Sequence, residues 1–338
     1  MIDVTALGET LIDFTPCGKS EAGQRIFEQN PGGAPANVLA CLNKCGKKTA
    51  FIGKVGNDMH GQFLIDVMND SGINTDGVIV DDNVFTTLAF VGLSETGERS
   101  FSFARKPGAD TCLTQEELKE EIIRDSKVFH IGSLSLTTEP ARGTTFRALE
   151  IAKEAGCIIS YDPNYRAPLW DSKETAIKGM RSVVSYVDVM KISDEETELL
   201  TDIAEPEGAA KKLVDMGVTV VAVTLGADGA VVCTKEGCEK VPGFKADMVD
   251  TTGAGDSFWG GFLKCLLESG KRPEDVSIQE ATEFANYGNA VASLCVEKRG
   301  AIPAMPSAQD IFVRISDGQG TAVVDNLDSR PSKIKRFR

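Results

Sequence analysis

The feature that most constrains the fold is a regular alternation of predicted helices and strands between residues 115 and 224. Apolar residues recur there with helical or strand periodicity, and short polar connections separate the segments. The predicted elements are helices 115–123, 140–155, 173–183, 195–200 and 207–216 and strands 128–131, 157–161, 187–191 and 219–224. Because such alternation places helices on both faces of a mostly parallel sheet, we predict a three-layer α/β/α sandwich.

The flanking segments continue this plan and add two hairpins. Residues 4–14 are predicted to begin as a buried strand. The other predicted elements are a strand at 49–53, helices at 61–70 and 278–296, and hairpins at 84–104 and 230–242. In the first hairpin, Glu95-Thr-Gly-Glu98 joins the two strands, and the hairpin would serve as a lid or as a subunit contact. Residues 15–30 are polar and are predicted to be irregular.

These patterns predict one domain over residues 1–315, with lid segments at about 13–30 and 84–106. Residues 316–338 lack periodicity and form a C-terminal tail with no assigned role. Its basic tip, Lys333-Ile-Lys-Arg-Phe-Arg338, is expected to be solvated. The predicted fold class is therefore α/β, with a mostly parallel central sheet and a small β-lid.

Composition narrows the function classes. The chain has 36 basic and 50 acidic residues in 338, a formal net charge of −14, which argues against nucleic-acid or membrane-surface partners. No apolar run reaches the length of a membrane span. His60 and His130 are the only histidines, so histidine-based metal or triad chemistry has almost no material.

The nine cysteines are scattered, without a Cys-x-x-Cys pair, and no signal peptide is recognised. We therefore expect reduced, mostly buried thiols and a cytoplasmic protein. Cys41 and Cys45 lie one helical turn apart on an apolar stripe, which favours core packing over a shared metal.

The stretch Asp250-Thr-Thr-Gly-Ala-Gly-Asp-Ser-Phe combines a glycine turn with the start of a helix that runs to Gly270. The unpaired N–H groups at such a helix start bind anions, phosphate above all. Asp256 would stand beside a transferring phosphoryl group and accept a hydroxyl proton, or it would simply cap the helix. Gly260 and Gly261 inside the helix predict that something approaches closely there, which supports a phosphate site.

A second stretch, Pro31-Gly-Gly-Ala-Pro-Ala-Asn-Val, repeats this logic with Pro35 in the first turn of a predicted helix. Asn37 lies in that turn, where its amide would suit adjacent sugar hydroxyls or would cap the helix. Polar clusters follow the carboxyl ends of predicted strands, where they would complete a ligand crevice. They are Glu9 with Asp13, Asp162-Pro-Asn-Tyr-Arg166, Lys191-Ile-Ser-Asp-Glu-Glu196, and Thr224-Leu-Gly-Ala-Asp-Gly229. The alternatives are loop solvation for the first cluster, at even odds with ligand binding, and ordinary turns for the other three.

Other nucleotide-binding signatures are missing from the sequence. No Gly-x-x-x-x-Gly-Lys-Ser/Thr motif and no protein-kinase signature occur. Gly-x-Gly-x-x-Gly also fails at the central loop, because Phe258 occupies the third glycine position. Walker-type and dinucleotide sites therefore lose their main support.

The two glycine stretches resemble the two signatures of the ribokinase-like (PfkB) carbohydrate kinase family, and the resemblance extends over about residues 1–310. Gly-Gly-Ala-Pro-Ala-Asn-Val, Phe101-Ser-Phe-Ala-Arg-Lys-Pro-Gly-Ala-Asp110 and Asp162-Pro-Asn-Tyr-Arg-Ala-Pro-Leu-Trp170 are similar to bacterial fructokinases. The resemblance implies a ribokinase-like fold and ATP-dependent phosphoryl transfer to a primary hydroxyl of a sugar.

The resemblance also assigns roles to residues. Asp256 would be the base, with a pKa near its reference value of about 4, and Arg166 would line the phosphate side. Gly253, Ala254 and Gly255 would form an anion hole. Sugar-binding positions would be Asp13, Gly32, Gly33, Asn37 and Arg105. Nucleotide-binding positions would be Lys191, Ser193, Thr224, Gly226, Gly229 and Asn289.

The implied cofactors are ATP and Mg²⁺, with K⁺ as a further candidate. Glu196 matches the glutamate of the Asn-x-x-Glu motif that organises Mg²⁺ through water, although Ser193 stands at the asparagine position. Asp250 and Thr252 match a monovalent-cation site of some members, although Ala304 stands where a serine ligand is common.

The resulting hypothesis is a cytoplasmic fructokinase, expected to be a homodimer with a sugar and ATP as its small-molecule partners. Alternatives are a 2-keto-3-deoxygluconate kinase or another sugar or nucleoside kinase of this fold. From a different class, a non-catalytic sugar or nucleotide sensor or a nucleoside-binding regulatory protein would use the same scaffold.

Overall fold

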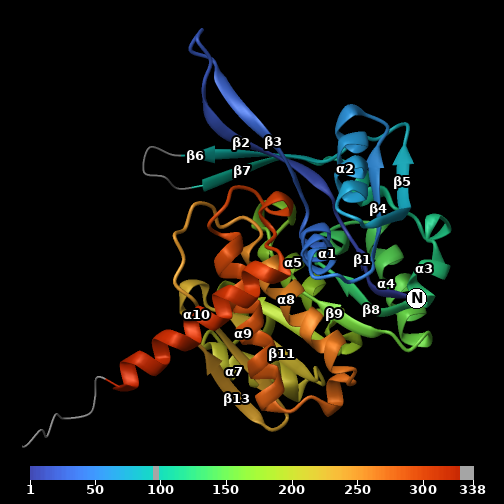
Figure 1. Cartoon of the computed structure of the whole chain (residues 1–338). Helices are drawn as coiled ribbons and strands as arrows, with labels where there is room; N and C mark the ends of the chain where they lie inside the picture. The colour runs from blue at the N-terminus through green and yellow to red at the C-terminus, as the bar shows by residue number, and fades with distance from the viewer. Residues whose placement is uncertain (94–98, 328–338) are drawn as a thin grey trace, which may run out of the picture.

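The computed structural model describes residues 1–93 and 99–327. They form a large sheet covered by helices and a separate small sheet (Figure 1). In spatial order the large sheet contains β13 (Gly237–Val241), β12 (Ala230–Thr234), β11 (Val220–Thr224), β10 (Val189–Ser193), β9 (Ile158–Tyr161), β8 (Ser126–Ile131), β1 (Ile2–Leu7), β4 (Thr49–Gly56) and β5 (Asn74–Asp81). Only the pairs β11–β12 and β12–β13 are antiparallel within it, so the mostly parallel sheet is confirmed.

The helices cover both faces of the large sheet, as the alternation predicted. They are α1 (Ala34–Lys44), α2 (Met59–Asp70), α3 (Glu120–Arg124), α4 (Ala141–Glu154), α5 (Lys173–Arg181), α6 (Thr197–Thr201), α7 (Pro206–Asp215), α8 (Ala254–Ser269), α9 (Ile278–Cys295) and α10 (Ala308–Leu327). Along β11, Val220 and Ala222 pack into the core under α1, α8 and α9. Val221 and Val223 pack into the core on the opposite face. This alternation is the consequence of side chains pointing to opposite faces of a strand.

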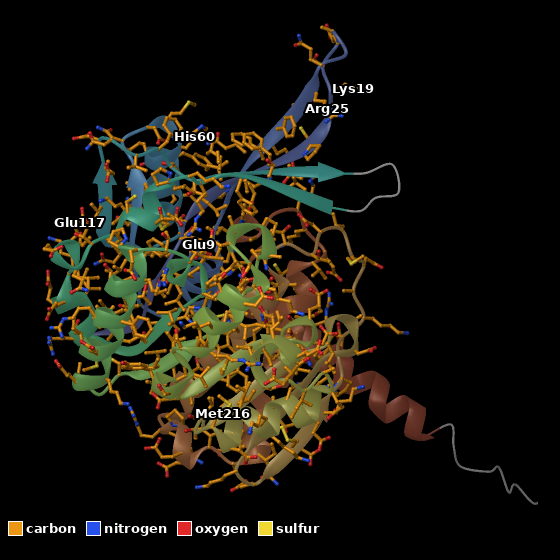
Figure 2. All side chains as sticks on the ribbon, turned by 180° about the vertical axis from the view of Figure 1, so that it is seen from behind. Glu9, Lys19, Arg25, His60, Glu117 and Met216 are labelled. Atoms are coloured by element: carbon orange, nitrogen blue, oxygen red, sulfur yellow. A yellow bond between two sulfur atoms is a disulfide. The ribbon has the colours of Figure 1, made fainter. Side chains whose placement is uncertain are left out.

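The small sheet corrects the prediction for residues 15–30. Those residues are regular, because β2 (Leu11–Lys19) and β3 (Arg25–Gly32) form an antiparallel hairpin. A register shift between Pro16 and Gly18 interrupts the strand alternation, which explains why the sequence gave no strand signal there. Lys19 and Arg25 pair near the tip of this hairpin, away from the main body (Figure 2).

The predicted hairpin at 84–104 completes the small sheet. β6 (Leu88–Leu93) and β7 (Arg99–Ala104) pair antiparallel, in the order β3-β2-β6-β7. Its turn, Glu95-Thr-Gly-Glu98, lies outside the described residues. That this sheet works as a lid stays a prediction.

Three further expectations need correction. Residues 115–123 form a short 3-10 turn followed by α3, because Leu118 is extended, with φ −63° and ψ 131°, and separates the two. β5 was not predicted, since this edge strand has few buried residues. The predicted tail boundary at residue 315 falls inside α10, where a side chain at Gly318 would meet Phe244 at 2.6 Å. The basic tip at 333–338 lies outside the described residues.

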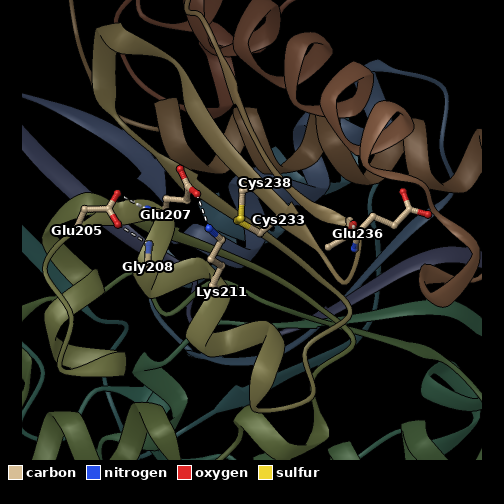
Figure 3. The surroundings of a disulfide bond; sticks show 8 residues. Glu205, Glu207, Gly208, Lys211, Cys233, Glu236 and Cys238 are labelled. Carbon is tan, nitrogen blue, oxygen red and sulfur yellow. Dashed lines mark hydrogen bonds and ion pairs between the residues drawn. A yellow bond between two sulfur atoms is a disulfide. The ribbon is translucent and has the colours of Figure 1, made fainter.

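The cysteines are not all reduced thiols. Cys233 and Cys238 face each other across the β12–β13 hairpin and form a disulfide (Figure 3). Their spacing in the sequence gave no sign of this, because only the strand register makes them neighbours. The other seven are free, and Cys41 is buried in the core with Cys45 packed against it, as predicted. No described helix is long and apolar enough to cross a membrane.

The two glycines inside α8 are explained by helix packing. A Cβ at Gly260 would stand 2.7 Å from Cys41 Cβ and 3.2 Å from the Val38 carbonyl oxygen, both on α1. A Cβ at Gly261 would stand 2.9 Å from Val291 Cγ2 and 3.1 Å from Gly288 Cα, both on α9. The close approach predicted from these glycines therefore exists, but neighbouring helices make it rather than a phosphate.

We expect Gly260→Ala to lower the free energy of unfolding by about 1–3 kcal/mol, because the added methyl overpacks the α1–α8 contact. In Gly143→Ala, the methyl would meet only the flexible ends of Glu139 and Gln115, at 3.1 and 3.5 Å. That control should be neutral or gain about 1 kcal/mol from helix propensity. Urea unfolding measures both, and equal effects would contradict the packing explanation.

Candidate active site

A cavity of about 790 Å³ opens where the parallel strands end. Loops after β1, β9, β10 and β11 line it, together with the amino-terminal ends of α1 and α8. Leu11, Asp13 and Thr15 of β2 and Val91 and Phe103 of the β6–β7 hairpin add a wall from the small sheet. The crevice expected at the carboxyl ends of the strands therefore exists.

Asp256 lies in the first turn of α8 and is only 6% exposed. The helix begins after Gly253, whose φ of 77° is in the left-handed region, and no side chain caps it. Asp256 is therefore not a helix cap. Its Oδ2 accepts a hydrogen bond from Asn37 Nδ2 at 2.8 Å, and its Oδ1 accepts one from Asn164 Nδ2 at 3.4 Å. Two amides thus hold the carboxylate at the cavity wall.

Asn37 is likewise not a cap, since α1 has Gly33 at its N-cap position and no side-chain cap. The Asn37 side chain is buried, and its Nδ2 is used by Asp256. Its Oδ1 has no hydrogen-bond partner among the described residues, although it is buried and Asn37 lines the cavity. A buried acceptor without a partner is rare in proteins, so this oxygen is suited to a ligand hydroxyl.

Burial raises the proton affinity of the acids in the cavity. Burial raises the pKa of Asp256 to about 6, and Asp162 adds to the rise, while Asn37, Lys191 and Arg166 oppose it. The value of about 4 expected from the sequence is therefore wrong, because desolvation of the carboxylate was not visible there. Burial also raises the pKa of Asp13 to about 6, against the effect of Arg166. Both carboxyls are still mostly ionised at neutral pH.

Lys191 supplies positive charge beneath the glycine loop. Its Nζ donates to Asp162 Oδ2 at 2.9 Å, and both side chains are buried. Burial lowers the pKa of Lys191, but Asp162, Glu196 and Asp256 together hold it above its ordinary value. A Cβ at Gly255 would stand 2.8 Å from this Nζ. Glycine therefore lets the loop pass close to the ammonium group, and loop and ammonium together are suited to an anion.

Glu196 offers oxygen ligands at the same end of the cavity. Its Oε1 accepts the Tyr165 N–H at 2.6 Å and its Oε2 accepts the Ser193 N–H at 2.8 Å. Among residues 1–93 and 99–327, no group of three His, Cys, Asp or Glu side chains could hold a metal ion by itself. The single Glu196 carboxylate fits Mg²⁺, which proteins hold through few carboxylates together with water and substrate phosphates.

Asp250 joins the two loops of the predicted monovalent-cation site. Its Oδ1 accepts hydrogen bonds from the Thr252 N–H at 3.0 Å and the Thr252 hydroxyl at 2.8 Å. Its Oδ2 accepts the Gly300 N–H at 3.0 Å. The carboxylate therefore fixes the loop that precedes α8 against the loop that follows α9.

Most of the predicted site residues line the one cavity. These are Asp13, Gly33, Asn37, Arg166, Lys191, Ser193, Glu196, Thr224, Gly226, Asp250, Thr252, Gly253, Ala254, Gly255 and Asp256. The predicted residues that do not line it are Gly32, Arg105, Gly229 and Asn289.

Each of these four has a structural explanation. The Arg105 guanidinium is buried, donating from Nε to Asp110 at 2.8 Å and from its second terminal nitrogen to the Leu134 carbonyl oxygen at 2.8 Å. The Asn289 amide donates to the carbonyl oxygens of Val241 and Pro242, at 3.2 and 3.1 Å. A Cβ at Gly229 would clash with the Val241 carbonyl oxygen, and one at Gly32 would clash with Asp13 Oδ2.

The site also contains residues that the sequence analysis did not single out. Asn164, beside Asp256, has a φ of 47°, a left-handed conformation that asparagine tolerates better than most residues. The dipeptide Pro163-Asn164 is a turn signal that could have identified it. Glu9, placed with Asp13 in the predicted crevice but given no role of its own, also lines the cavity.

Comparisons with known proteins agree with this geometry. The pattern of the pfkB family carbohydrate kinases matches residues 1–308. Probable fructokinase-5 of Arabidopsis thaliana is 43% identical over 91% of this chain and 95% of its own. A fructokinase from Xylella fastidiosa with bound ATP has a TM-score of 0.85 at 31% identity, over 94% of this chain and 100% of its own. A double mutant of the Vibrio cholerae O395 fructokinase, in a fructose-, ADP- and potassium-bound form, has a TM-score of 0.83 at 31% identity, covering 93% and 98%.

We expect Asp256→Asn to stabilise the protein at neutral and alkaline pH. The folded-state pKa of about 6 exceeds the ordinary value of 3.8, so the folded chain holds a proton that the unfolded chain loses between these pH values. Stability therefore falls as pH rises through this window, by about 3 kcal/mol. Urea unfolding at pH 8 should show the gain, and the gain should shrink toward pH 4.

Asp202→Asn is the matched control. Arg181 holds the pKa of the exposed Asp202 carboxyl below its ordinary value, and asparagine tolerates its left-handed backbone, φ 62°. This variant should show no gain at pH 8. A gain of equal size in both variants would contradict the burial argument for Asp256.

Proposed function

Because the chain belongs to the pfkB family of carbohydrate kinases and has their ribokinase-like fold, we propose that it phosphorylates D-fructose at the 6-hydroxyl with ATP. The observation that carries this function is the buried Asp256 carboxylate. Asn37 holds it beside the glycine turn at the start of α8, on the wall of a cavity that also contains an acceptor without a partner among the described residues. The fructokinase names of its relatives agree with this substrate.

Asp256 acts on the sugar hydroxyl in this proposal. Its pKa of about 6 leaves it ionised at neutral pH, so that it can accept the proton as the hydroxyl attacks phosphorus. Asn37 keeps the carboxylate in place through Nδ2 and presents Oδ1 to the sugar. Asp13 offers a further carboxylate acceptor on the wall from the small sheet. The sugar is thereby oriented by acceptors on both sides of the base.

The phosphate end depends on positive charge and backbone amides. The N–H groups of Gly253 and Gly255 at the start of α8 and the Lys191 ammonium would stabilise the transferring phosphoryl group. The Ala254 N–H, expected to join them, instead donates to the Thr251 carbonyl oxygen at 3.2 Å. The exposed Arg166 guanidinium lines the same cavity. Mg²⁺, organised through water by Glu196, would neutralise phosphate charge when bound. Ser193, Thr224 and Gly226 would line the nucleotide side.

K⁺ is proposed for the loops that Asp250 joins. The Asp250 carboxylate and the Thr252 hydroxyl bring oxygen atoms together in these loops, beside the start of α8. The potassium-bound form of the Vibrio cholerae double mutant supports this assignment by likeness. A cytoplasmic location belongs to the same proposal, and the seven free cysteines support it.

The alternatives lose support from two observations. A sugar-acid kinase would use Arg105 and Arg166 for the carboxylate of its substrate, but Arg105 is occupied by Asp110 and lies outside the cavity wall. A non-catalytic sensor has no need of a desolvated base, whereas this cavity contains one in the buried Asp256 carboxylate.

A homodimer is proposed through the exposed face of the small sheet. Phe14 and Phe90 stack at a ring-centroid distance of 5.2 Å, and Phe27 meets Phe90 edge-on at 6.4 Å. Phe27 and Phe90 are 37% and 39% exposed. An aromatic patch on an open sheet is a surface that a second copy of the chain would cover.

Asp256→Asn is expected to lower kcat by about 10²- to 10⁴-fold while the dissociation constant of D-fructose stays nearly unchanged, because the amide cannot accept the proton. A coupled ADP-release assay over a sugar panel measures turnover, and calorimetry measures binding. In the wild type, kcat/KM should fall as pH drops below about 6, where Asp256 becomes protonated. Equal losses of binding and turnover would instead assign Asp256 a structural role.

Phe27→Ser should convert a dimer to a monomer, because it removes an aromatic side chain from the exposed patch. Light scattering after size exclusion measures the mass of each variant. Phe312→Ser is the control, since Phe312 is 66% exposed on α10 and lies outside the small sheet. A wild-type chain that is monomeric at micromolar concentration would contradict the proposal.

A further inference from the structure

Glu9 is a buried acid in the cavity that the mechanism above does not use. It follows β1 in the loop that leads into β2, and it is 3% exposed. Figure 2 shows it between the small sheet and the main body, and it contributes to the lining of the cavity. Its position at the carboxyl end of a central parallel strand is where α/β folds bind their ligands.

The two carboxylate oxygens of Glu9 have different surroundings. Oε1 accepts the N–H of Ala34, the first residue of α1, at 3.0 Å. Oε2 is buried and has no hydrogen-bond partner among the described residues. Burial raises the pKa of Glu9 to about 7, with Asp110 adding to the rise, while the N–H groups of Glu9 and Ala34 and the Arg105 guanidinium oppose it. An unpaired carboxylate oxygen in a dry site is unfavourable unless a ligand supplies its partner.

The chemistry of the surroundings selects the ligand class. A carboxylate repels phosphate, which excludes the nucleotide as the partner of Oε2. No described cluster of three acids, histidines or cysteines could hold a metal ion there. The remaining class is a neutral hydrogen-bond donor such as a sugar hydroxyl.

Asn37 strengthens this assignment. It stands one helical turn after Ala34 on α1, and its Oδ1 is a second buried acceptor without a partner among the described residues. The first turn of α1 therefore positions both acceptors. It contains Asn37, and its Ala34 N–H binds the Glu9 carboxylate. Two acceptors of this kind suit two hydroxyls of one polyol.

We propose that Glu9 is a specificity-determining residue, whose Oε2 accepts a hydrogen bond from a sugar hydroxyl other than the one that is phosphorylated. The proposal rests on the proposed function of the same cavity. A site built to pair a hydroxyl rejects analogues that lack it, because the buried acceptor is then left without a partner. Glu9 thereby contributes to sugar selection while Asp256 carries the proton transfer.

Glu9→Gln tests the proposal, because glutamine keeps a carbonyl oxygen for the Ala34 N–H but places an amide donor where Oε2 stood. We expect the KM and dissociation constant of D-fructose to rise roughly 10- to 100-fold. The KM of ATP should stay unchanged, and kcat should change much less than KM. The melting temperature at neutral pH should not fall and should rise, because burial raises the pKa of Glu9 and the neutral amide removes that cost. A fall in melting temperature together with a rise in the KM of ATP would show a purely structural role.

Glu236→Gln is the matched control. Glu236 Oε2 accepts the N–H of Ile278, the first residue of α9, at 2.9 Å, so it contacts a helix start as Glu9 does. It lies in the β12–β13 turn beside the disulfide (Figure 3), outside the cavity lining. This variant should leave the KM of fructose unchanged. A similar rise in both variants would assign the effect to helix-start charge and overturn the proposal.

Sugar analogues identify the hydroxyl and separate the two hypotheses. 1-Deoxy-, 3-deoxy- and 4-deoxy-D-fructose and 2,5-anhydro-D-mannitol each lack one candidate hydroxyl. For one of them, Glu9→Gln should cause no further loss of binding, whereas equal losses with all four would overturn the proposal. If the wild type phosphorylates another sugar instead of fructose, the fructokinase assignment fails but the Glu9 proposal does not. The comparison of wild type and Glu9→Gln is then repeated with deoxy forms of that sugar. If no sugar binds, both fail.

Discussion

The hydrogen bond between Asn37 and Asp256 links the amino-terminal ends of two helices that are 219 residues apart in sequence. It forms because α1 and α8 pack closely one turn further along, where Gly260 leaves room for Cys41. The contact between the helices therefore sets the position of the base. A shift of either helix would leave a buried carboxylate and a buried amide without partners, which is unfavourable by about 1–3 kcal/mol for each group. The packing of the core and the geometry of the site are thus one constraint.

The charge distribution of the cavity follows from its two tasks. Burial raises the pKa of both Asp13 and Asp256, and Arg166 counters the rise at both carboxyls. Asp256 adds to the rise at Asp13, and Lys191 opposes the rise at Asp256. The acids present acceptors to a sugar, and the cations face the glycine loop where phosphate charge would gather. Concentrating desolvated carboxylates lowers stability in the empty protein, as expected where a site is built for function. Substrate hydroxyls and phosphates would relieve both kinds of unpaired charge.

The sequence predicted the large sheet, its helices and its crevice because those depend on local periodicity and on glycine at helix starts. It failed for β2 and β3, where the register shift at Pro16 and Gly18 breaks the strand pattern. It also failed for α10, whose helical pattern was missed around the glycine that packs on Phe244. The disulfide depends on strand register alone. Tertiary partners likewise decide that Arg105 is occupied by Asp110, which no local pattern contains.

Gly260 and Glu9 show that the type of a residue alone does not tell whether it packs against the protein or binds a ligand. The glycine correctly predicted a close approach, but the residue type could not say whether a ligand or a helix makes it. The strand-end carboxylate gave no more than an even choice between solvation and binding, although its position was correct. What distinguishes them is the inventory of partners: the Gly260 backbone is covered by Cys41 and Val38, whereas one oxygen of Glu9 has no partner among the described residues. Unmet hydrogen-bonding capacity in a buried group is therefore the property that separates a binding residue from a packing residue here.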